Sequence, residues 1–394
     1  MNLVRRVGLS LFAPVLALVV ALVISALVMA ALQVNPFRVF EVMLDFGETP
    51  SQQVTQIVVV LNRSMPLFLA GLAVAIAFRM GLFNIGVEGQ YRLAMILAAA
   101  VGAAVALPGP LHVLLIILTA MVVGAAWASI VAVLKVTRGV SEVISSIMLN
   151  FIALGLASYL LTGPLRGPGQ GSIVSTEEIA ESGWLPSLNG LLGAIGLAEP
   201  PRQLYGFLPI AVVVGVVIAV LLNRTRFGFD LKASGLSPSA ATASGVDARR
   251  MVIKAMLLSG GIAGLIGLPD LFGSTHAYTT NFTSGLGFLG IAVALLGRNR
   301  PGGIAVAALL FAFLDRAQVP LQIEQFPSSV VTIIQGTIVL AVVVANEVAR
   351  RLARRAAETG ATRVPTVVAG DGGAEPFDDE SEAVASAERR GVQA

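Results

Sequence analysis

The chain has 394 residues, of which 56% are hydrophobic and only 12% are charged, and its mean hydropathy is +0.85. Soluble domains carry about 25% charged residues, so this composition excludes an ordinary soluble protein and predicts one that crosses a membrane several times. Without cysteine the chain has no disulfides, no thiolate catalysis and no cysteine-bound metal, and since His112 and His276 are its only histidines, we expect no histidine metal site. The net charge of +3 says little, because the cytoplasmic loops of membrane proteins are usually basic.

Ten apolar segments approach or exceed the roughly 20 residues that a spanning helix needs. They are Val7–Ala31, Val54–Ala77, Gln90–Leu107, Leu111–Leu134, Val140–Leu161, Leu204–Leu222, Met251–Phe272, Phe282–Gly297, Gly302–Gln318 and Ser328–Val348. The first follows Arg5 and Arg6 and is longer than a signal core of about 7–15 residues, so we interpret it as an uncleaved spanning helix. We therefore expect an all-α polytopic membrane protein with about ten transmembrane helices, in which residues 1–53 form the first helix and an outer loop.

The basic residues predict that both ends of the chain are cytoplasmic. In that orientation the outside receives only Arg38, Arg63, Arg166, Arg202 and Arg316. The cytoplasmic side receives the other basic residues, among them a cluster at Arg350, Arg351, Arg354 and Arg355 that would face anionic lipid. The permease-like core then covers residues 54–355. Residues 356–394, rich in Ala, Gly, Glu and Asp, are predicted to form a disordered cytoplasmic tail.

A basic island at residues 223–254 separates two long apolar segments and contains a short helix signal, Leu236–Gly245. Ser237 is a good N-cap, Pro238 suits the first helical position and Gly245 suits the C-terminal end. Between them, Ala240 and Ala241 are among small residues that give the helix no apolar face to bury in a core of its own. We interpret it as a helix that docks into a groove of another protein, and the alternative is a plain connector.

The first polar interruption of the apolar pattern lies at Phe78–Arg92. The glycines Gly81, Gly86 and Gly89 permit non-helical backbone, and polar groups come from Asn84, Glu88 and Gln90. Irregular backbone survives at membrane depth only where protein or water satisfies it, so a broken helix beside a solute pathway would explain this stretch. The alternative is a tight turn in which Glu88 pairs with Arg79 or Arg92.

Two further interruptions follow. Glu142, Ser146 and Asn150 are spaced by four residues and share one helix face, which we expect to point into the bundle, for solute contact or for helix association. Leu268–Leu289 contains Asp270, Asn281 and several glycines, and interrupts the second half as Gly81–Gly89 interrupts the first. Paired broken segments are typical of transporters with two inverted repeats and discontinuous helices, although no sequence similarity joins the two halves here.

The sequence contains no catalytic motif. A phosphate-binding Gly-x-x-x-x-Gly-Lys-Ser/Thr loop, a nucleophile elbow and a His-Glu-x-x-His pair are all absent from it. We therefore expect no enzyme, no catalytic or metal-binding residues and no cofactor bound by this chain. If ATP drives transport, a partner subunit must hydrolyse it.

Four stretches together resemble one family. Phe83–Gln90 is similar to the signature of permease subunits of bacterial ABC importers for nucleosides, which belong to the ribose and branched-chain amino acid permease superfamily. Glu142–Ala153 and Gly290–Asn299 resemble two more family stretches, and Gly235–Val246 resembles the segment that couples to the ATPase. The sequence departs from the family pattern at Leu289, where an acid is usual, and at Ala243-Ser244, where a tyrosine is usual.

The resemblance implies a set of partners in a bacterial plasma membrane. These are an ABC ATPase subunit, a second permease subunit that would make a heterodimer, and an extracytoplasmic substrate-binding lipoprotein; nothing indicates a nucleic acid. The ATPase would contact a coupling site. Its predicted residues are Leu236, Ser237, Pro238, Ala240, Ala241 and Gly245.

The polar inventory at membrane depth favours a neutral solute, because charges that neutralise an ionic one would be costly there. The predicted pathway residues are Asn84, Glu88, Gln90, Glu142, Ser146, Asn150, Asn281 and Phe288. Amides and hydroxyls suit a sugar, and a phenyl ring such as Phe288 could stack on a base, so we expect nucleosides to be preferred. The alternatives are a simple-sugar ABC permease and a secondary transporter or channel that needs no ATPase.

Overall fold

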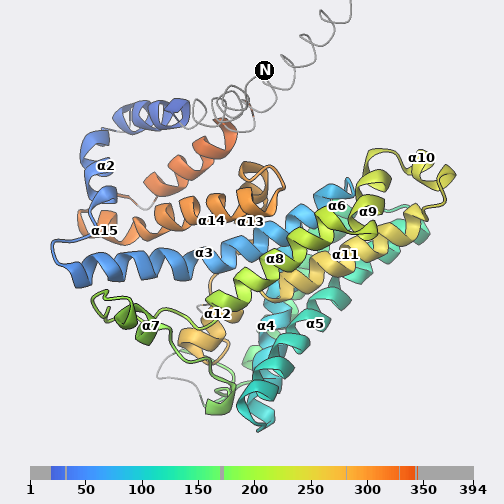
Figure 1. The fold of residues 1–394 in the computed structure, drawn as a ribbon, viewed down its shortest axis with the longest axis horizontal. Helices are drawn as coiled ribbons and strands as arrows, with labels where there is room; N and C mark the ends of the chain where they lie inside the picture. Colours follow the sequence, from blue (N-terminus) through green and yellow to red (C-terminus); the bar gives the residue numbers. More distant parts are fainter. Residues whose placement is uncertain are drawn as a thin grey trace, which may run out of the picture. The chain divides into compact units, whose positions relative to one another are not determined.

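The computed structural model describes residues 19–31, 33–168, 173–280, 282–327, 329–341 and 344. Within these residues the regular structure is helical, and an isolated antiparallel β bridge joins Ser175 and Thr279. The prediction of an all-α protein is therefore confirmed for this part of the chain (Figure 1). The predicted tail at residues 356–394 and the arginine cluster before it lie outside the described residues.

The helices follow the apolar segments of the sequence in chain order. They are Val19–Ala31, α2 (Pro36–Leu44), α3 (Pro50–Arg79), α4 (Val87–Ala104), α5 (Gly109–Arg138), α6 (Glu142–Thr162), α7 (Asn189–Ala194), α8 (Leu208–Arg224), α9 (Arg226–Leu236), α10 (Pro238–Ala243), α11 (Ala248–Gly264), α12 (Leu268–Asp270), α13 (Leu286–Leu296), α14 (Pro301–Arg316), α15 (Gln318–Ile323) and Ser329–Ala341. A 3₁₀ turn, η1 (Glu181–Gly183), and a π-helical turn, η2 (Leu271–Thr275), complete the regular structure of the described residues.

Five helices in the described part of the chain are long and apolar enough to cross a bilayer: α3, α5, α6, the run Ala248–Thr275 and the run Pro301–Ile323. A sixth would be α8 with α9, which meet at a bend of 66°. Two other predicted spans fall on a shorter or more polar helix, since α13 has 11 residues and α4 carries Glu88 in its first turn. The first and last predicted spans, Val7–Ala31 and Ser328–Val348, lie partly outside the described residues. The prediction of ten spans and two inverted repeats is therefore confirmed only as an all-helical chain with five or six candidate spans.

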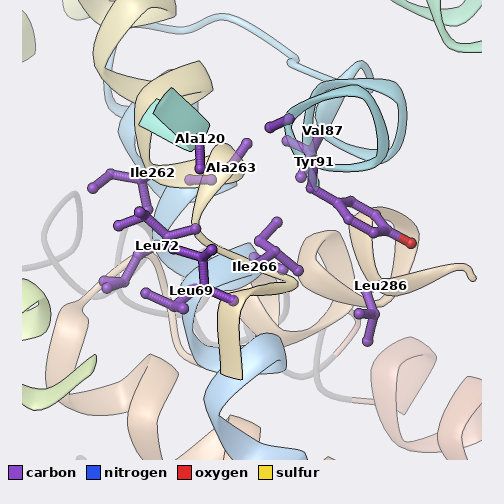
Figure 2. Packing of buried hydrophobic residues seen from close by; sticks show 14 of the residues in the cluster. Leu69, Leu72, Val87, Tyr91, Ala120, Ile262, Ala263, Ile266 and Leu286 are labelled. Carbon is purple, nitrogen blue, oxygen red and sulfur yellow. The ribbon is translucent and has the colours of Figure 1, made fainter. Parts of the chain in front are cut away.

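Glycines bring α5 and α11 into close contact. A Cβ atom on Gly260 would collide with the carbonyl oxygen of Gly124, and one on Gly264 would collide with that of Ala120. Small residues spaced four apart let the backbones of membrane helices approach in this way. Beside this contact, Ile262 packs among buried leucines of α3 (Figure 2).

The long loop after α6 folds back onto the segment after η2. The amide of Thr176 donates to the carbonyl of Tyr278 over 2.9 Å, and the rings of Trp184 and His276 stack with centroids 3.8 Å apart. Its far end is tied to α3, because Asn62 donates to the carbonyl of Gln203 over 2.8 Å. The loop thus borders the same end of α3 as η2, which is where a polar cavity lies.

Candidate functional site

The chain between α3 and α4, residues 80–86, is not helical, so the first predicted interruption is a genuine break. Inside it the amides of Asn84 and Gln90 exchange two hydrogen bonds, of 3.1 and 3.0 Å, and Asn84 also donates to Ser259 of α11 over 2.9 Å. The expectation that all three glycines permit an unusual backbone holds only for Gly81, whose φ is +73°. Gly86 has an ordinary φ of −68° and is needed for space, since a Cβ there would press on its neighbours.

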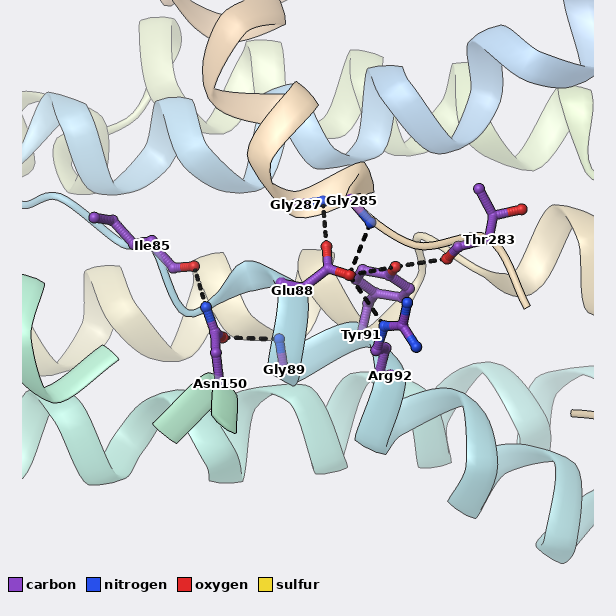
Figure 3. Close-up of polar contacts among 9 residues, drawn as sticks. All are labelled: Ile85, Glu88, Gly89, Tyr91, Arg92, Asn150, Thr283, Gly285 and Gly287. Atoms are coloured by element: carbon purple, nitrogen blue, oxygen red, sulfur yellow. Dashed lines mark hydrogen bonds and ion pairs between the residues drawn. The ribbon is translucent and has the colours of Figure 1, made fainter. Parts of the chain in front are cut away.

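Glu88 is a buried carboxylate that joins α4 to the start of α13 (Figure 3). One oxygen accepts from the amide of Gly285 over 2.9 Å and the other from the amide of Gly287 over 3.0 Å. The first oxygen also lies 3.0 Å from Arg92 Nε and 3.0 Å from the Tyr91 hydroxyl. A carboxylate at the positive end of a helix, paired with an arginine, is well stabilised, so this contact clamps the two broken segments together.

The α6 face predicted to point inward is buried against the broken segment. Asn150 donates to the carbonyl of Ile85 over 2.9 Å and accepts from the amide of Gly89 over 2.8 Å (Figure 3). The Ser146 hydroxyl is fully buried and donates within its own helix over 3.1 Å. At the helix start, Glu142 pairs with Lys135 over 2.6 Å.

Most predicted pathway residues therefore form hydrogen bonds to other groups of the chain: Asn84 and Gln90 bond to each other, whereas Glu88 and Asn150 bond mainly to backbone groups of neighbouring segments. The paired alternative for Glu88 is confirmed with Arg92, over 3.0 Å, whereas Arg79 binds carbonyl and amide oxygens instead. Phe288 is 52% exposed on α13, and Asn281 lies outside the described residues. A role of the predicted pathway residues in solute movement remains a prediction.

A polar cavity of about 660 Å³ lies between the first half of α3, η2 and the loop that precedes α8. A smaller one of about 290 Å³ adjoins it and reaches α14. The two share the side chains of Arg63, Asp270 and Thr283. A site of this size, with few polar groups beside aromatic rings such as Tyr205 and Phe282, is typical of small-molecule binding.

The charges around these two cavities balance. Arg63 and Arg202 face Asp270 and Asp315, and Arg63 Nε lies 3.5 Å from Asp315 Oδ2. His276 adds no charge at neutral pH, because burial lowers the pKa of its ring. By formal charge, the cavities therefore have polar groups to offer but no surplus of either sign.

Sequence reasoning gave no role to Arg63, although it placed this residue on the outer side of the membrane and within the predicted span Val54–Ala77. The helix begins four residues before that span, because Thr49 and Gln52 form a capping box and Pro50 occupies the first turn. Arg63 lies well inside a helix of 30 residues, and no local signal indicated that this helix borders a polar cavity. Leu289, where the resemblance expects an acid, lines the smaller cavity.

The predicted docking helix exists as α10, between α9 and α11 (Figure 1). The Ser237 hydroxyl accepts from the amide of Ala240 over 3.4 Å, Pro238 is in the first turn, and Gly245 follows the helix with a φ of +84°. These cap predictions are confirmed. Ala240 is exposed and Leu236 is 78% exposed, whereas Ala241 is buried, so the accessible face is narrower than the predicted set.

Comparison with known proteins gives the chain a family. The model described as the permease component of branched-chain amino acid transport systems matches residues 56–343. The glucose ABC transporter permease protein TsgB13 of Haloferax volcanii is 35% identical over 83% of this chain and 85% of its own. The guanosine ABC transporter permease protein NupP of Bacillus subtilis is 34% identical over 86% of this chain and 94% of its own length. The nucleoside ABC transporter permease protein NupB of Lactococcus lactis is 30% identical over 84% and 90%.

The last two organisms each have a second, more distant match. NupC of Lactococcus lactis is 28% identical over 68% of this chain and 84% of its own, and NupQ of Bacillus subtilis is 28% identical over 63% and 76%. No solved structure matches the chain.

Proposed function

The chain belongs to the permease components of branched-chain amino acid transport systems, and we propose that it carries a nucleoside, or a similar neutral solute, across the membrane in an ATP-driven importer. The observation that supports this solute class is similarity over 86% and 84% of the chain to permeases named for guanosine and for nucleosides. Members of this family are membrane permease subunits, so the chain is not an enzyme. Membership also argues against the alternative of a secondary transporter or channel that needs no ATPase.

The balanced cavity at Arg63 and Asp270 supports a route for this solute. Its hydroxyl, amide and carboxylate groups can bind the polar edge of a neutral molecule, and the rings of Tyr205 and Phe282 offer a surface for a base. A surplus of one charge would favour an ionic solute, and none is present among the lining residues. In this proposal the Glu88 clamp positions the broken segments beside the route.

The proposed ATPase contact is α10 with the end of α9. Leu236, at the end of α9, is 78% exposed, and it lies in the basic island at 223–254. An exposed apolar patch with a charged rim suits a protein partner. The basic residues also support a cytoplasmic location for α9 and α10 and for both termini. ATP would then be hydrolysed by the partner, not by this chain.

The paired relatives support a second permease subunit. NupP and NupQ, like NupB and NupC, are two permease proteins of one organism, and this chain is more similar to one of each pair. We propose a heterodimer served by an external binding lipoprotein. We also propose ten crossings related by inverted repeats, with the core at residues 54–355 and a cytoplasmic tail at 356–394.

A sugar is the second candidate, and one observation favours it: the relative named for glucose is 35% identical to this chain. The lining groups suit hydroxyls as well as they suit a base. The two solutes therefore have to be separated by experiment.

The test is competition for uptake in vesicles that contain the complete complex. We expect unlabelled uridine or adenosine to compete with a labelled nucleoside, ribose and glucose to compete poorly, and nucleotides to fail. Arg63→Gln should lower uptake at least about tenfold, because it leaves two carboxylates without their cation. If sugars compete and nucleosides do not, the solute is a sugar. If Arg63→Gln transports normally, the route lies elsewhere.

A further inference from the structure

An apolar groove runs along the outer face of the bundle where α8 and α14 pass over α3. Its volume is about 430 Å³, and Val212, Val216 and Leu309 border it with largely exposed side chains. Phe68 of α3 forms part of its floor and packs directly on α8, since a Cβ on Gly215 would lie 2.5 Å from the Phe68 ring. The groove is therefore a shaped channel between helices rather than a flat surface.

A cavity of about 910 Å³ continues this groove at one end. The two share Ala219, Pro301 and Gly302. Four cations line the cavity: Arg79, Lys232, Arg298 and Arg300. No Asp or Glu is among the lining residues, and none of the four cations forms an ion pair within the described part of the chain. Four like charges around one space are costly unless an anion compensates them.

Two further features favour an anion in the same place. Arg79 is held by the carbonyls of Leu222 and Asn299, at 3.0 and 3.4 Å, so its charge is fixed at the cavity wall. The first turn of α14 also faces the cavity through Gly302 and Gly303, and no side chain caps that end of the helix. The free amides of a helix start favour negative charge.

The turn before α14 contains Arg298 and Asn299 and contributes to the cationic cavity. Their φ angles are 56° and 54°, a left-handed conformation that residues other than glycine rarely adopt. The turn ends α13, since the amides of Arg298 and Asn299 donate to the carbonyls of Leu295 and Ala294 over 3.0 and 2.9 Å, and it brings Arg298 and Arg300 to one cavity.

We propose that this combined site binds an anionic phospholipid, with the phosphate in the cationic cavity and an acyl chain in the groove. A soluble anion would explain the cations but not the continuous groove, and a neutral lipid would explain the groove but not the cations. Basic pockets between membrane helices bind anionic head groups in this way. Such a lipid would hold the α8–α9 bend to the α13–α14 turn, whichever solute the chain transports.

The probe is phosphatidylglycerol, added to the full chain purified with its associated subunits in detergent. Bound lipid is measured by native mass spectrometry, and thermal stability by unfolding. We expect phosphatidylglycerol to bind and to raise the unfolding temperature more than phosphatidylcholine does. Glycerol phosphate, a soluble anion that carries a phosphate group but no acyl chains, should not replace it.

Two pairs of variants locate the site. Arg298→Gln with Arg300→Gln should weaken phosphatidylglycerol binding by about 30-fold, since each basic residue near an anionic lipid contributes about fivefold. Arg249→Gln with Lys254→Gln removes the same charge from exposed positions on α11 and should change little. Ala305→Phe should block the groove, whereas Val306→Phe, at a 69% exposed position outside it, should not.

Three outcomes would overturn the proposal. Equal binding of phosphatidylcholine would mean that the cations play no part. Full replacement by glycerol phosphate would mean a site for a soluble anion. Unchanged lipid binding in the arginine pair, with loss of the ATPase subunit instead, would mean that these cations serve carboxylates of a protein partner.

Discussion

At the scale of single residues, Glu88 shows how a charge is accommodated inside this bundle. Its side chain is 5% exposed and that of Arg92 is 14% exposed, so both charges have left water. The cost of burying them is offset because two backbone amides, a guanidinium and a hydroxyl surround the carboxylate. All four of these donors belong to the chain itself and join α4 to the start of α13, which is why we assign the clamp a positioning role.

Glu88→Gln should destabilise the protein by about 3–5 kcal/mol, because Arg92 loses its counter-charge and an NH₂ group then faces a backbone amide. The measurement is the unfolding temperature of the purified chain, with its level in the membrane as a second readout. Glu41→Gln is the matched control, since the Glu41–Arg38 pair is exposed and should matter little. Equal stability of the two variants would show that the clamp contributes nothing.

At the scale of elements, the close approach of α5 and α11 depends on glycine. Gly264→Ala should sharply reduce the amount of folded protein, because the new methyl group would collide with the carbonyl of Ala120 on the other helix. Gly155→Ala in α6 is the control, because no atom lies within 4 Å of its Cβ position. Detergent-resistant, monodisperse protein after solubilisation is the readout. A well-folded Gly264→Ala variant would contradict this packing argument.

The α10 helix allows a sharper test of coupling than the sequence did. Ala240→Asp adds a charge to an exposed position of the proposed docking face, so it should weaken retention of the ATPase subunit about tenfold without lowering the level of this chain in the membrane. Ala240→Ser should retain the ATPase. Ala241→Asp should damage the chain itself, since Ala241 is 4% exposed. Undiminished co-purification of the ATPase with Ala240→Asp would exclude α10 as the contact.

The sequence predicted those elements in which local chemistry decides. Apolar runs located the helices, the Ser237, Pro238 and Gly245 signals located α10, and four-residue spacing placed Ser146 and Asn150 on a buried face. Sequence reasoning failed where the structure depends on contacts between segments that are far apart in the chain. No local signal indicates that Glu88 meets the start of α13, or that residues 286–296 form a helix too short to span by itself.

The cavity was equally beyond local reasoning, because it depends on where α3 begins and on which helices surround it. Arg63 is more than 200 residues from Asp270 and from Asp315 along the chain, and the three meet only in the fold. The roles of the glycines in the first broken segment also required the structure. Of Gly81, Gly86 and Gly89, only Gly81 has a positive φ.

At the scale of the whole molecule, backbone contacts connect the proposed ATPase contact to the proposed solute route. α10 packs on α9, and the end of α9 touches the break, because a Cβ on Gly235 would collide with the carbonyl of Arg79. The break leads into Glu88, which holds the start of α13, and Leu286 and Leu289 of α13 line the smaller cavity. A shift of α9 therefore has a continuous mechanical path to the cavity.

Gly81 lies in the middle of this path and provides the test. Its φ of +73° disfavours any other residue by about 1–2 kcal/mol, and a Cβ there would lie 3.3 Å from the carbonyl of Gly235. Gly81→Ala should thus shift the break against α9 while α10 stays intact, so ATPase retention should be normal but ATP-driven uptake should fall at least about tenfold. Gly139→Ala is the control, because its φ is +67° and no atom lies within 4 Å of its Cβ position, so it carries the same backbone cost without the contact. Uptake and ATP hydrolysis are measured together in vesicles, and we expect hydrolysis without uptake in Gly81→Ala alone. If both variants transport equally well, motion does not pass through the break, and coupling must reach the cavity through α11.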